Sequence, residues 1–219
     1  SWAIQWLSQV PAVIEDHLQV AYCADESVRS AYAKQAAHDW HEFVAFRGRE
    51  LCPGGRLVVL TMALDEHGEF GYRPLLDAVV DGLSELTADG LLTEDEVHRM
   101  CLPTVGRREA DFLAPFAPSG RFERLSVEHL EVFNADDRFW MQYQVDHDAS
   151  AFGALWAAFV RASIFPTLAT ALADGRNDPR SPEFFDRLET GIAERLAAAP
   201  EQMQIPFAKL VLTKQRQTK

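Results

Sequence analysis

The sequence contains few cysteines, few basic residues and no long apolar run. Its three cysteines, Cys23, Cys52 and Cys101, are widely spaced and indicate neither a disulfide framework nor a Cys-x-x-Cys metal site. Lysine and arginine number 21 against 33 aspartates and glutamates, so the formal net charge is −12. We expect no nucleic acid and no membrane as partner, because both carry negative charge. Without a membrane-spanning segment or a signal-peptide pattern, the expected location is cytoplasmic.

Clusters that would indicate a metal site or a catalytic dyad are also scarce. His38, Asp39 and His41 lie close in sequence, but positions i, i+1 and i+3 do not share one face of a helix. The segment Asp146–Asp148 is interpreted as a polar loop rather than a set of metal ligands. The serine, histidine and aspartate residues show no nucleophile-elbow signature. We therefore predict neither a metal ion nor a catalytic general base.

What the sequence does contain is enough apolar surface for a core, or for a core plus a cap, since 47% of the 219 residues are hydrophobic. Apolar residues recur at helical spacing over residues 27–51, and Pro53-Gly54-Gly55 ends that helix. Residues 56–64 are a run of leucine and β-branched residues, typical of a strand buried on both faces of a mostly parallel sheet. The glycines follow a helix and precede a strand, so a turn is favoured over a nucleotide loop.

The rest of the chain alternates helices with two further strands. Pro74 opens a predicted helix that reaches Ala88. Residues 93–96 fit a capping box that opens a short helix to Met100. The remaining predicted elements are a short helix at 107–116, strands at 121–133 and 207–213, and helices at 149–173 and 182–199. The two strands would form an antiparallel hairpin, with the helices between them as an insertion.

The first eleven residues place two indoles, Trp2 and Trp6, four positions apart in an apolar run. Tryptophan offers a large flat apolar face and one N–H donor, which suits a flat or apolar ligand with one anionic end. Core packing is the alternative interpretation of such a pair.

Two blocks of this sequence resemble the SABATH carboxyl methyltransferases of the salicylate, benzoate and theobromine type. The first is Trp-Leu-Ser-Gln-Val-Pro at residues 6–11, which is specific to that family. The second runs from Tyr32 through Gln35 and Asp39 to residues 50–60, which contain Glu-Leu-Cys-Pro-Gly-Gly-Arg. Pro-Gly-Gly before a strand is common among methyltransferases and carries less weight. The resemblance continues more loosely to the C-terminus.

The resemblance implies an α/β fold, a partial Rossmann-like class I methyltransferase sheet with an α-helical cap. Residues 1–67, 120–134 and 205–219 would form the core, and residues 68–119 and 135–204 the cap. Family members carry an upstream region that holds the ribose of S-adenosylmethionine, and nothing before residue 1 is present here. The chain is therefore similar to the C-terminal part of such an enzyme, and we expect this fragment alone to be inactive.

The resemblance also implies roles for individual residues. Trp6 matches the position whose indole N–H binds the substrate carboxylate, and Trp2 matches an aromatic position between cofactor and substrate. Gln5 falls where the family touches the substrate body. Five further residues match pocket positions, with core packing as the open alternative: Leu75, Leu76, Val160, Ser163 and Phe207.

The expected reaction is methyl transfer from the cofactor S-adenosylmethionine to a small or fatty carboxylic acid. A carboxylate of pKa about 4 to 5 is already ionised at neutral pH, so no general base is needed. Positioning of the two reactants can lower the activation barrier by roughly 7 to 11 kcal/mol. An aliphatic wall without a polar partner for a phenol favours an apolar acid, and bacterial fatty-acid methyltransferases belong to the same family.

Three alternatives stay open at this stage. A family member can methylate a ring nitrogen or a hydroxyl instead, as the theobromine branch does. A chain without the cofactor-binding half could be a non-catalytic module that binds carboxylates. A homodimer is open as the oligomeric state.

Overall fold

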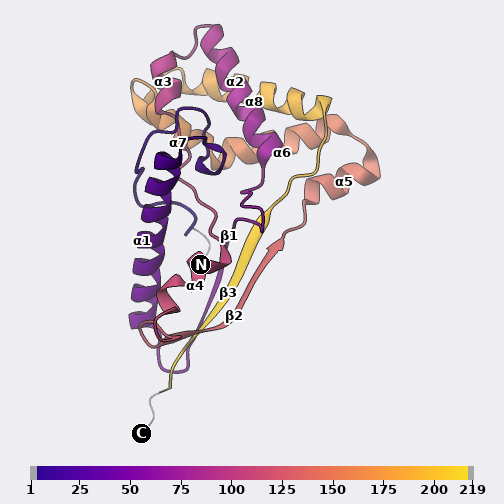
Figure 1. The fold of residues 1–219 in the computed structure, drawn as a ribbon. Coiled ribbons are helices and arrows are strands. Elements are labelled where there is room, and N and C mark those ends of the chain that lie inside the picture. Colours follow the sequence, from indigo (N-terminus) through magenta and orange to yellow (C-terminus); the bar gives the residue numbers. More distant parts are fainter. Residues whose placement is uncertain (1–3, 217–219) are drawn as a thin grey trace.

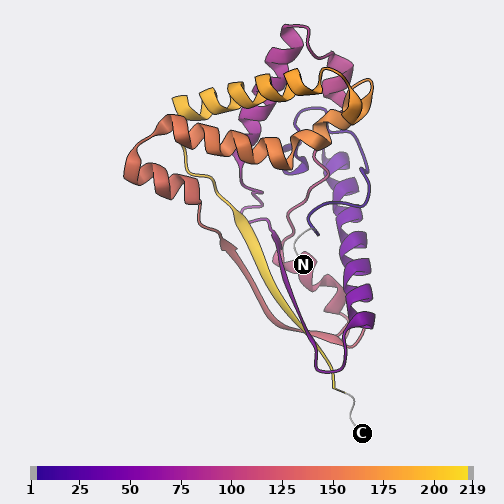
Figure 2. The same ribbon diagram turned by 180° about the vertical axis from the view of Figure 1, so that it is seen from behind.

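The computed structural model describes residues 4–216 as a small sheet, a long helix beside it and a layer of helices at one end (Figures 1 and 2). The helices are α1 (Glu26–Glu50), α2 (Arg73–Ala88), α3 (Glu94–Arg99), α4 (Glu109–Leu113), α5 (Arg138–Asp146), α6 (Ala149–Ser163), α7 (Phe165–Leu168) and α8 (Ser181–Ala198). The strands are β1 (Arg56–Met62), β2 (Leu125–Asn134) and β3 (Pro206–Lys214). Short 3-10 turns lie at Val20–Tyr22, Ala114–Phe116, Ala169–Ala171 and Gly175–Asn177.

The sheet has the order β1-β3-β2, and β3 pairs antiparallel with both neighbours. Alternate residues of a strand face the same side, and in β3 these are Ala208, Leu210 and Leu212, all fully buried. They pack with the side chains of Trp40 from α1 and Phe112 from α4. The predicted hairpin of β2 and β3 is confirmed, and α5 to α8 lie between its two strands in sequence.

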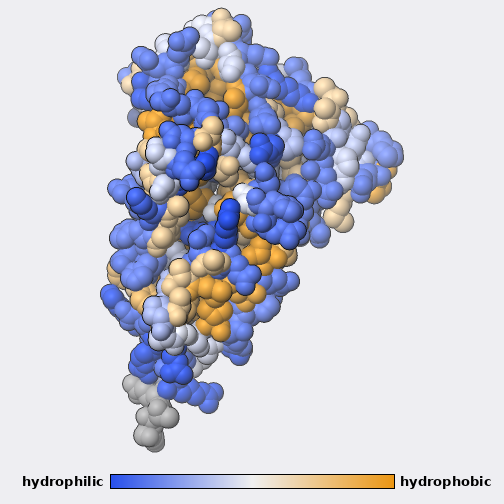
Figure 3. Space-filling model, viewed as in Figure 1, coloured by the Kyte–Doolittle hydropathy of each residue, from blue (hydrophilic) through white to orange (hydrophobic). Residues whose placement is uncertain are grey.

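The burial of β1 differs from the expectation. Within the described residues β1 pairs only with antiparallel β3, and Val58 and Leu60 are 49% and 40% exposed. The prediction of a strand buried on both faces is therefore wrong for this part of the chain. Only the face of Val59 packs into the core beneath α1 and α4. Figure 3 shows apolar residues gathered on one face of the lower half of the molecule, which contains the sheet.

The predicted helix ends are confirmed at several positions. The Asp25 carboxylate accepts from the N–H groups of Ser27 and Val28 at the start of α1. Thr93 and Glu96 form the expected capping box of α3, in which each side chain bonds the backbone of the other. Gly54 and Gly90 have φ of +81° and +77°, a conformation that glycine adopts without strain, and they follow α1 and α2.

Two helical predictions need correction. The predicted helix at 149–173 is broken after Ser163, because Pro166 has no N–H and its ring would clash with the carbonyl of the preceding turn. Helix α5 was not predicted, and Asp146 belongs to it rather than to a loop. None of its residues is fully buried, so the sequence shows no strong apolar period there.

The helical layer has its own core, formed by α2, α6, α7 and α8. A methyl group on Gly153 of α6 would overlap the Ala193 carbonyl of α8, so the two helices are in close backbone contact. The division into core and cap stays a prediction. Phe112 and Phe116 nevertheless pack with the sheet, although they lie in the segment 68–119 that was assigned to the cap.

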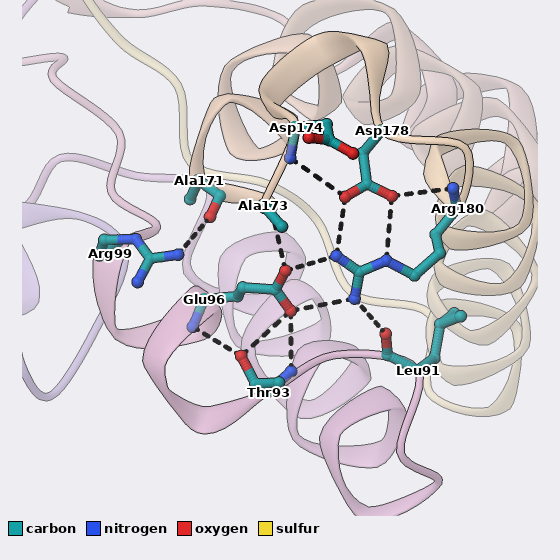
Figure 4. Close-up of polar contacts among 9 residues, drawn as sticks. All are labelled: Leu91, Thr93, Glu96, Arg99, Ala171, Ala173, Asp174, Asp178 and Arg180. Carbon is teal, nitrogen blue, oxygen red and sulfur yellow. Dashed lines mark hydrogen bonds and ion pairs between the residues drawn. The ribbon is translucent and has the colours of Figure 1, made fainter.

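A buried ion-pair network fixes α3 to the loop before α8 (Figure 4). The Arg180 guanidinium contacts the carboxylates of Glu96 at 2.5 Å and Asp178 at 2.8 Å, and both carboxylates are only 4% exposed. Hydrogen bonds from Arg180 lower the pKa of Glu96 to about 2 and lower that of Asp178 as well. The Ala173 N–H also donates to Glu96. The network is a structural tie within the helical layer.

Candidate functional site

A cavity of about 190 Å³ lies where the helical layer meets the sheet and the N-terminal segment. Its walls come from the N-terminal segment, the end of β1, the start of α2, the end of α6 and the start of β3. The lining residues are Gln5, Trp6, Met62, Phe70, Tyr72, Leu75, Leu76, Leu102, Thr104, Phe159, Ser163, Ile164 and Phe207. The wall is mostly apolar, with a few polar side chains among the hydrophobic ones.

Six of the eight residues predicted from the sequence lie together on this wall: Gln5, Trp6, Leu75, Leu76, Ser163 and Phe207. They come from segments up to about 200 residues apart, which only the fold brings together. Their roles in binding stay predictions. The remaining two are Trp2, which lies outside the described residues, and Val160.

Val160 does not line the cavity, contrary to the prediction. Its side chain is fully buried among the side chains of the helical core. Successive residues on a helix point about 100° apart. Phe159 and Ser163 of α6 line the cavity, whereas Val160 packs in the core of the helical layer.

The N-terminal segment is held against residues 103–105 by backbone hydrogen bonds. The Leu7 N–H donates to the Pro103 carbonyl at 2.7 Å, and the Val105 N–H donates to the Gln5 carbonyl at 2.9 Å. Trp6 and Thr104 face each other in an antiparallel bridge between these bonds. The backbone of the Trp-Leu-Ser motif is thus fixed at the cavity wall before any ligand enters.

Ser8, the serine of the Trp-Leu-Ser motif, is held in place by Asp39 of α1. The Asp39 carboxylate accepts from the Ser8 N–H at 2.8 Å and from the Ser8 hydroxyl at 2.7 Å. It also accepts from the Gln35 side-chain amide at 2.9 Å. Asp39 was considered as a metal ligand with His38 and His41, and the structure instead shows it holding the motif. Within residues 4–216, no three or more His, Cys, Asp or Glu side chains gather as they would around a metal ion.

Two donors on the cavity wall have no protein partner among the described residues. The Thr61 hydroxyl donates to the side-chain oxygen Oε1 of Gln5 at 3.3 Å. The side-chain N–H groups of Gln5 have no partner among the described residues. The half-buried indole N–H of Trp6 is likewise without a partner in the described part of the chain. A buried or half-buried donor favours an acceptor atom of a ligand.

Three hydroxyl groups complete the polar part of the wall. The Thr104 hydroxyl accepts from the side chain of fully buried Gln19 at 2.8 Å, so its own hydrogen is free to donate. The Ser163 hydroxyl donates to the Phe159 carbonyl at 2.7 Å and keeps its lone pairs. Burial raises the pKa of Tyr72 to about 12, so its phenol stays neutral at physiological pH.

The described part of the wall carries no charged side chain. None of the described lining residues is Asp, Glu, Lys, Arg or His. An apolar cavity with unpaired N–H donors and no carboxylate suits a ligand whose body is apolar and whose one end is an anion. It offers no general base for abstracting a proton.

Seven lining residues were not predicted from the sequence: Met62, Phe70, Tyr72, Leu102, Thr104, Phe159 and Ile164. Most of them lie at element ends or in connecting segments, where periodicity gives no signal. Tyr72 has φ of +57° directly before α2, and its N–H donates to the Gln204 carbonyl at 3.0 Å. The Phe-Gly-Tyr sequence before Pro74 is the one local signal for a sharp turn there.

One structural finding bears on membranes. Within the described residues no single helix has the length and apolar character to cross a bilayer, and only the bent pair Ala149–Ser163 with Phe165–Ala171 reaches that length and composition together.

The family model described as SAM dependent carboxyl methyltransferase matches residues 1–215. The chain is 27% identical over 153 residues to the salicylate carboxymethyltransferase of Clarkia breweri, covering 68% of this chain and 41% of that relative. It is 25% identical over 215 residues to gibberellic acid methyltransferase 1 of Arabidopsis thaliana, covering 91% of this chain and 54% of the relative.

Among solved structures, a loganic acid methyltransferase with SAH matches with a TM-score of 0.68 and 22% identity. The match covers 98% of this chain and 60% of that one, and it confirms the methyltransferase fold. The chain spans about half the length of the curated relatives that it matches.

Proposed function

This chain belongs to the SAM-dependent carboxyl methyltransferases, and on that basis we propose that it forms the acceptor-binding part of an enzyme that methylates a small carboxylic acid. The observation that carries the proposal is the cavity at Trp6. It combines an apolar wall, two unpaired N–H donors and no charged side chain. This combination is suited to a carboxylate attached to an apolar body.

In the proposed mechanism the residues of this chain bind and orient the acid. Trp6 donates its indole N–H to one carboxylate oxygen and leaves the other oxygen as the methyl acceptor. The aromatic and aliphatic wall, including Phe207 and Leu76, excludes water from the reacting carboxylate. No residue has to remove a proton, because the acid is ionised at neutral pH.

The cavity at Trp6 does not fit S-adenosylmethionine itself. Pockets that enclose ligands of that size occupy about 300 Å³ or more, whereas this cavity holds about 190 Å³. Its wall also lacks an acidic side chain that could hold a ribose. We therefore assign no cofactor contact to the described lining residues of this cavity, and a cofactor role for Trp2 stays a prediction.

The size of the cavity favours a small acid over a long fatty acid. A chain of many methylene groups would exceed about 190 Å³ unless the wall opened. The wall most suited to opening is the stacked pair of Tyr72 and Phe159, whose ring centres lie 6.3 Å apart. Phe159 is 42% exposed, so the pair borders solvent. We propose a compact, largely apolar acid as the substrate.

Methylation of a hydroxyl is the second candidate, and the wall argues against it. A phenol or alcohol has to lose its proton during transfer, which requires a base within hydrogen-bond reach. Among the described lining residues neither histidine nor a carboxylate is present to accept that proton.

Mass spectrometry of products tests the proposal directly. The full-length protein is incubated with S-adenosylmethionine and a panel of benzoate, salicylate, octanoate and palmitate. We expect methyl esters of the compact acids and little or none of palmitate. Methylated phenol or amine products without any ester would contradict the proposal. Binding of the acids without turnover would support a non-catalytic carboxylate-binding module instead.

A further inference from the structure

Arg107 is an unusual residue because it is an arginine with only 1% of its surface exposed. It lies in the segment that leads from the cavity wall to α4. One terminal nitrogen donates to the Ile4 carbonyl at 2.9 Å, and the other donates to the Ala36 carbonyl of α1 at 3.0 Å. Its Nε is buried with no partner among the described residues.

The charge of Arg107 is poorly compensated within the described part of the chain. None of the ion pairs formed there includes it, and Asp39 and Asp111 act on it only from a distance. The ring of Trp40 lies 5.9 Å from the guanidinium carbon. Burial lowers the pKa of Arg107 to about 10, which still leaves it charged at neutral pH. A buried cation without a carboxylate is costly, and an apolar residue of similar size would avoid that cost.

What arginine adds at this position is a rigid planar fork that can hold two acceptors at once. The two acceptors belong to different elements. Ile4 contributes the peptide directly before Gln5 and Trp6, and Ala36 lies on the helix that also carries Asp39. The motif is therefore tied to α1 on both sides, by Arg107 before Trp6 and by Asp39 after it.

The backbone around Arg107 is fixed independently of its side chain. The Leu64 N–H donates to the Arg107 carbonyl at 3.0 Å. A methyl group on neighbouring Gly106 would overlap the Ala63 carbonyl, so the two backbones are already in contact. Loss of the guanidinium would leave this segment in place and leave the Ile4 carbonyl without its donor, so that, within the described residues, the backbone of residues 4–6 would be held only by the backbone bonds to residues 103–105.

We propose that Arg107 is a positioning residue that holds the Gln5–Trp6 segment so that the indole N–H points into the cavity. This inference rests on the proposed function, in which Trp6 binds the carboxylate. Arg107 does not line the cavity and acts only through the peptide before Gln5.

The test compares three variants of the full-length protein. Arg107→Met keeps the side-chain volume and removes all donors, and Arg107→Lys keeps the charge but can reach only one of the two carbonyls. Arg108→Gln removes an exposed arginine from the next position and serves as the matched control. KM for benzoate and kcat are measured together with the fluorine NMR signal of Trp6 in fluorotryptophan-labelled protein, assigned by its loss in Trp6→Phe.

We expect KM for benzoate to rise about tenfold in Arg107→Met, as one charge-assisted hydrogen bond is lost, with a smaller change in kcat. The Trp6 fluorine signal should shift or broaden. Arg107→Lys should give an intermediate KM, and Arg108→Gln should match wild type in both readouts. If Arg107→Met does not fold, KM and the Trp6 fluorine signal of Arg107→Lys test the inference instead.

A Trp6 signal and a KM that stay at wild-type values in the folded Arg107 variants would overturn the inference. Equal changes in Arg108→Gln would also overturn it, because a general charge effect would then explain the result. The fluorine signal separates this inference from the proposed function. If the wild-type protein makes no ester, the proposed function fails, and the Trp6 signal still reports whether Arg107 holds the segment.

Discussion

Replacing Trp6 with phenylalanine is the most direct test of the cavity. The change keeps a flat apolar ring on the cavity wall and removes an indole N–H that has no protein partner among the described residues. A hydrogen bond to a charged group contributes about 1.5 to 3 kcal/mol. Since about 1.4 kcal/mol corresponds to a factor of ten, kcat/KM for the best acid should fall by roughly one to two orders of magnitude.

The assay needs a control for the loss of an indole as such. Trp140 of α5 is a half-buried tryptophan that does not line the cavity and packs against Tyr143 and Phe152. Trp140→Phe should therefore keep wild-type kcat/KM. Melting temperatures of both variants should stay close to wild type. Unchanged kinetics in Trp6→Phe, or a large loss of thermal stability that accounts for the lost activity, would refute the assignment of Trp6 to carboxylate binding.

Further changes test the wall and the helical layer. Gln5→Met removes an amide whose burial costs about 1 to 3 kcal/mol when unpaired, so relative kcat/KM should move toward bulkier apolar acids; an unchanged acid profile would place Gln5 outside the binding wall. Phe159→Ala should let the cavity accept longer acids such as octanoate, measured by ester yield, and no change would contradict an opening at the Tyr72 stack. Val160→Phe should leave the acid profile unchanged and destabilise the fold by roughly 1 to 3 kcal/mol in a denaturant titration, because it overfills a packed core. Glu96→Gln should cost about 1 to 3 kcal/mol of stability, because hydrogen bonds to a charged group are weakened while Arg180 keeps Asp178 as its partner. The pKa of Glu96 is about 2 in the folded protein, against an ordinary value of 4.5. The stabilisation from its carboxylate is therefore complete above pH 4.5 and is lost as the pH falls toward 2. The free energies of unfolding of wild type and Glu96→Gln should consequently converge at acid pH.

The sequence allowed lining residues of the cavity to be predicted where they belong to a local motif. Trp6 opens the block at residues 6–11 and Gln5 directly precedes it, and the structure places both on the cavity wall. Val160 was assigned to the pocket from the family resemblance alone, with core packing as the open alternative, and its side chain packs in the helical core. Thr104 and Tyr72 could not be predicted, because their placement depends on a long-range bridge to Trp6 and on a left-handed backbone.

Helix ends could be predicted from the sequence because a few neighbouring residues determine them. The burial of strand faces could not, because it depends on packing against distant segments. The Pro-Gly-Gly turn after α1, Pro74 in the first turn of α2 and the capping box of α3 were predicted correctly, since each depends on a few neighbouring residues. The exposure of Val58 and Leu60 could not be read from their apolar character. Which faces of a strand are covered depends on other segments, and an apolar run is the same in either case.

The position of β3 between β1 and β2 has a consequence for how this chain is made. Of the three described strands, the central one emerges last from the ribosome. Val59 of β1 pairs with Leu210 of β3, which is synthesised about 150 residues later. Until then β1 and β2 share no neighbour in the sheet, and their unsatisfied edges are exposed to other nascent chains. Pairing over such sequence separation is intrinsically slow. Truncation near residue 206 would leave both outer strands without the partner that joins them, and we expect such products to be insoluble.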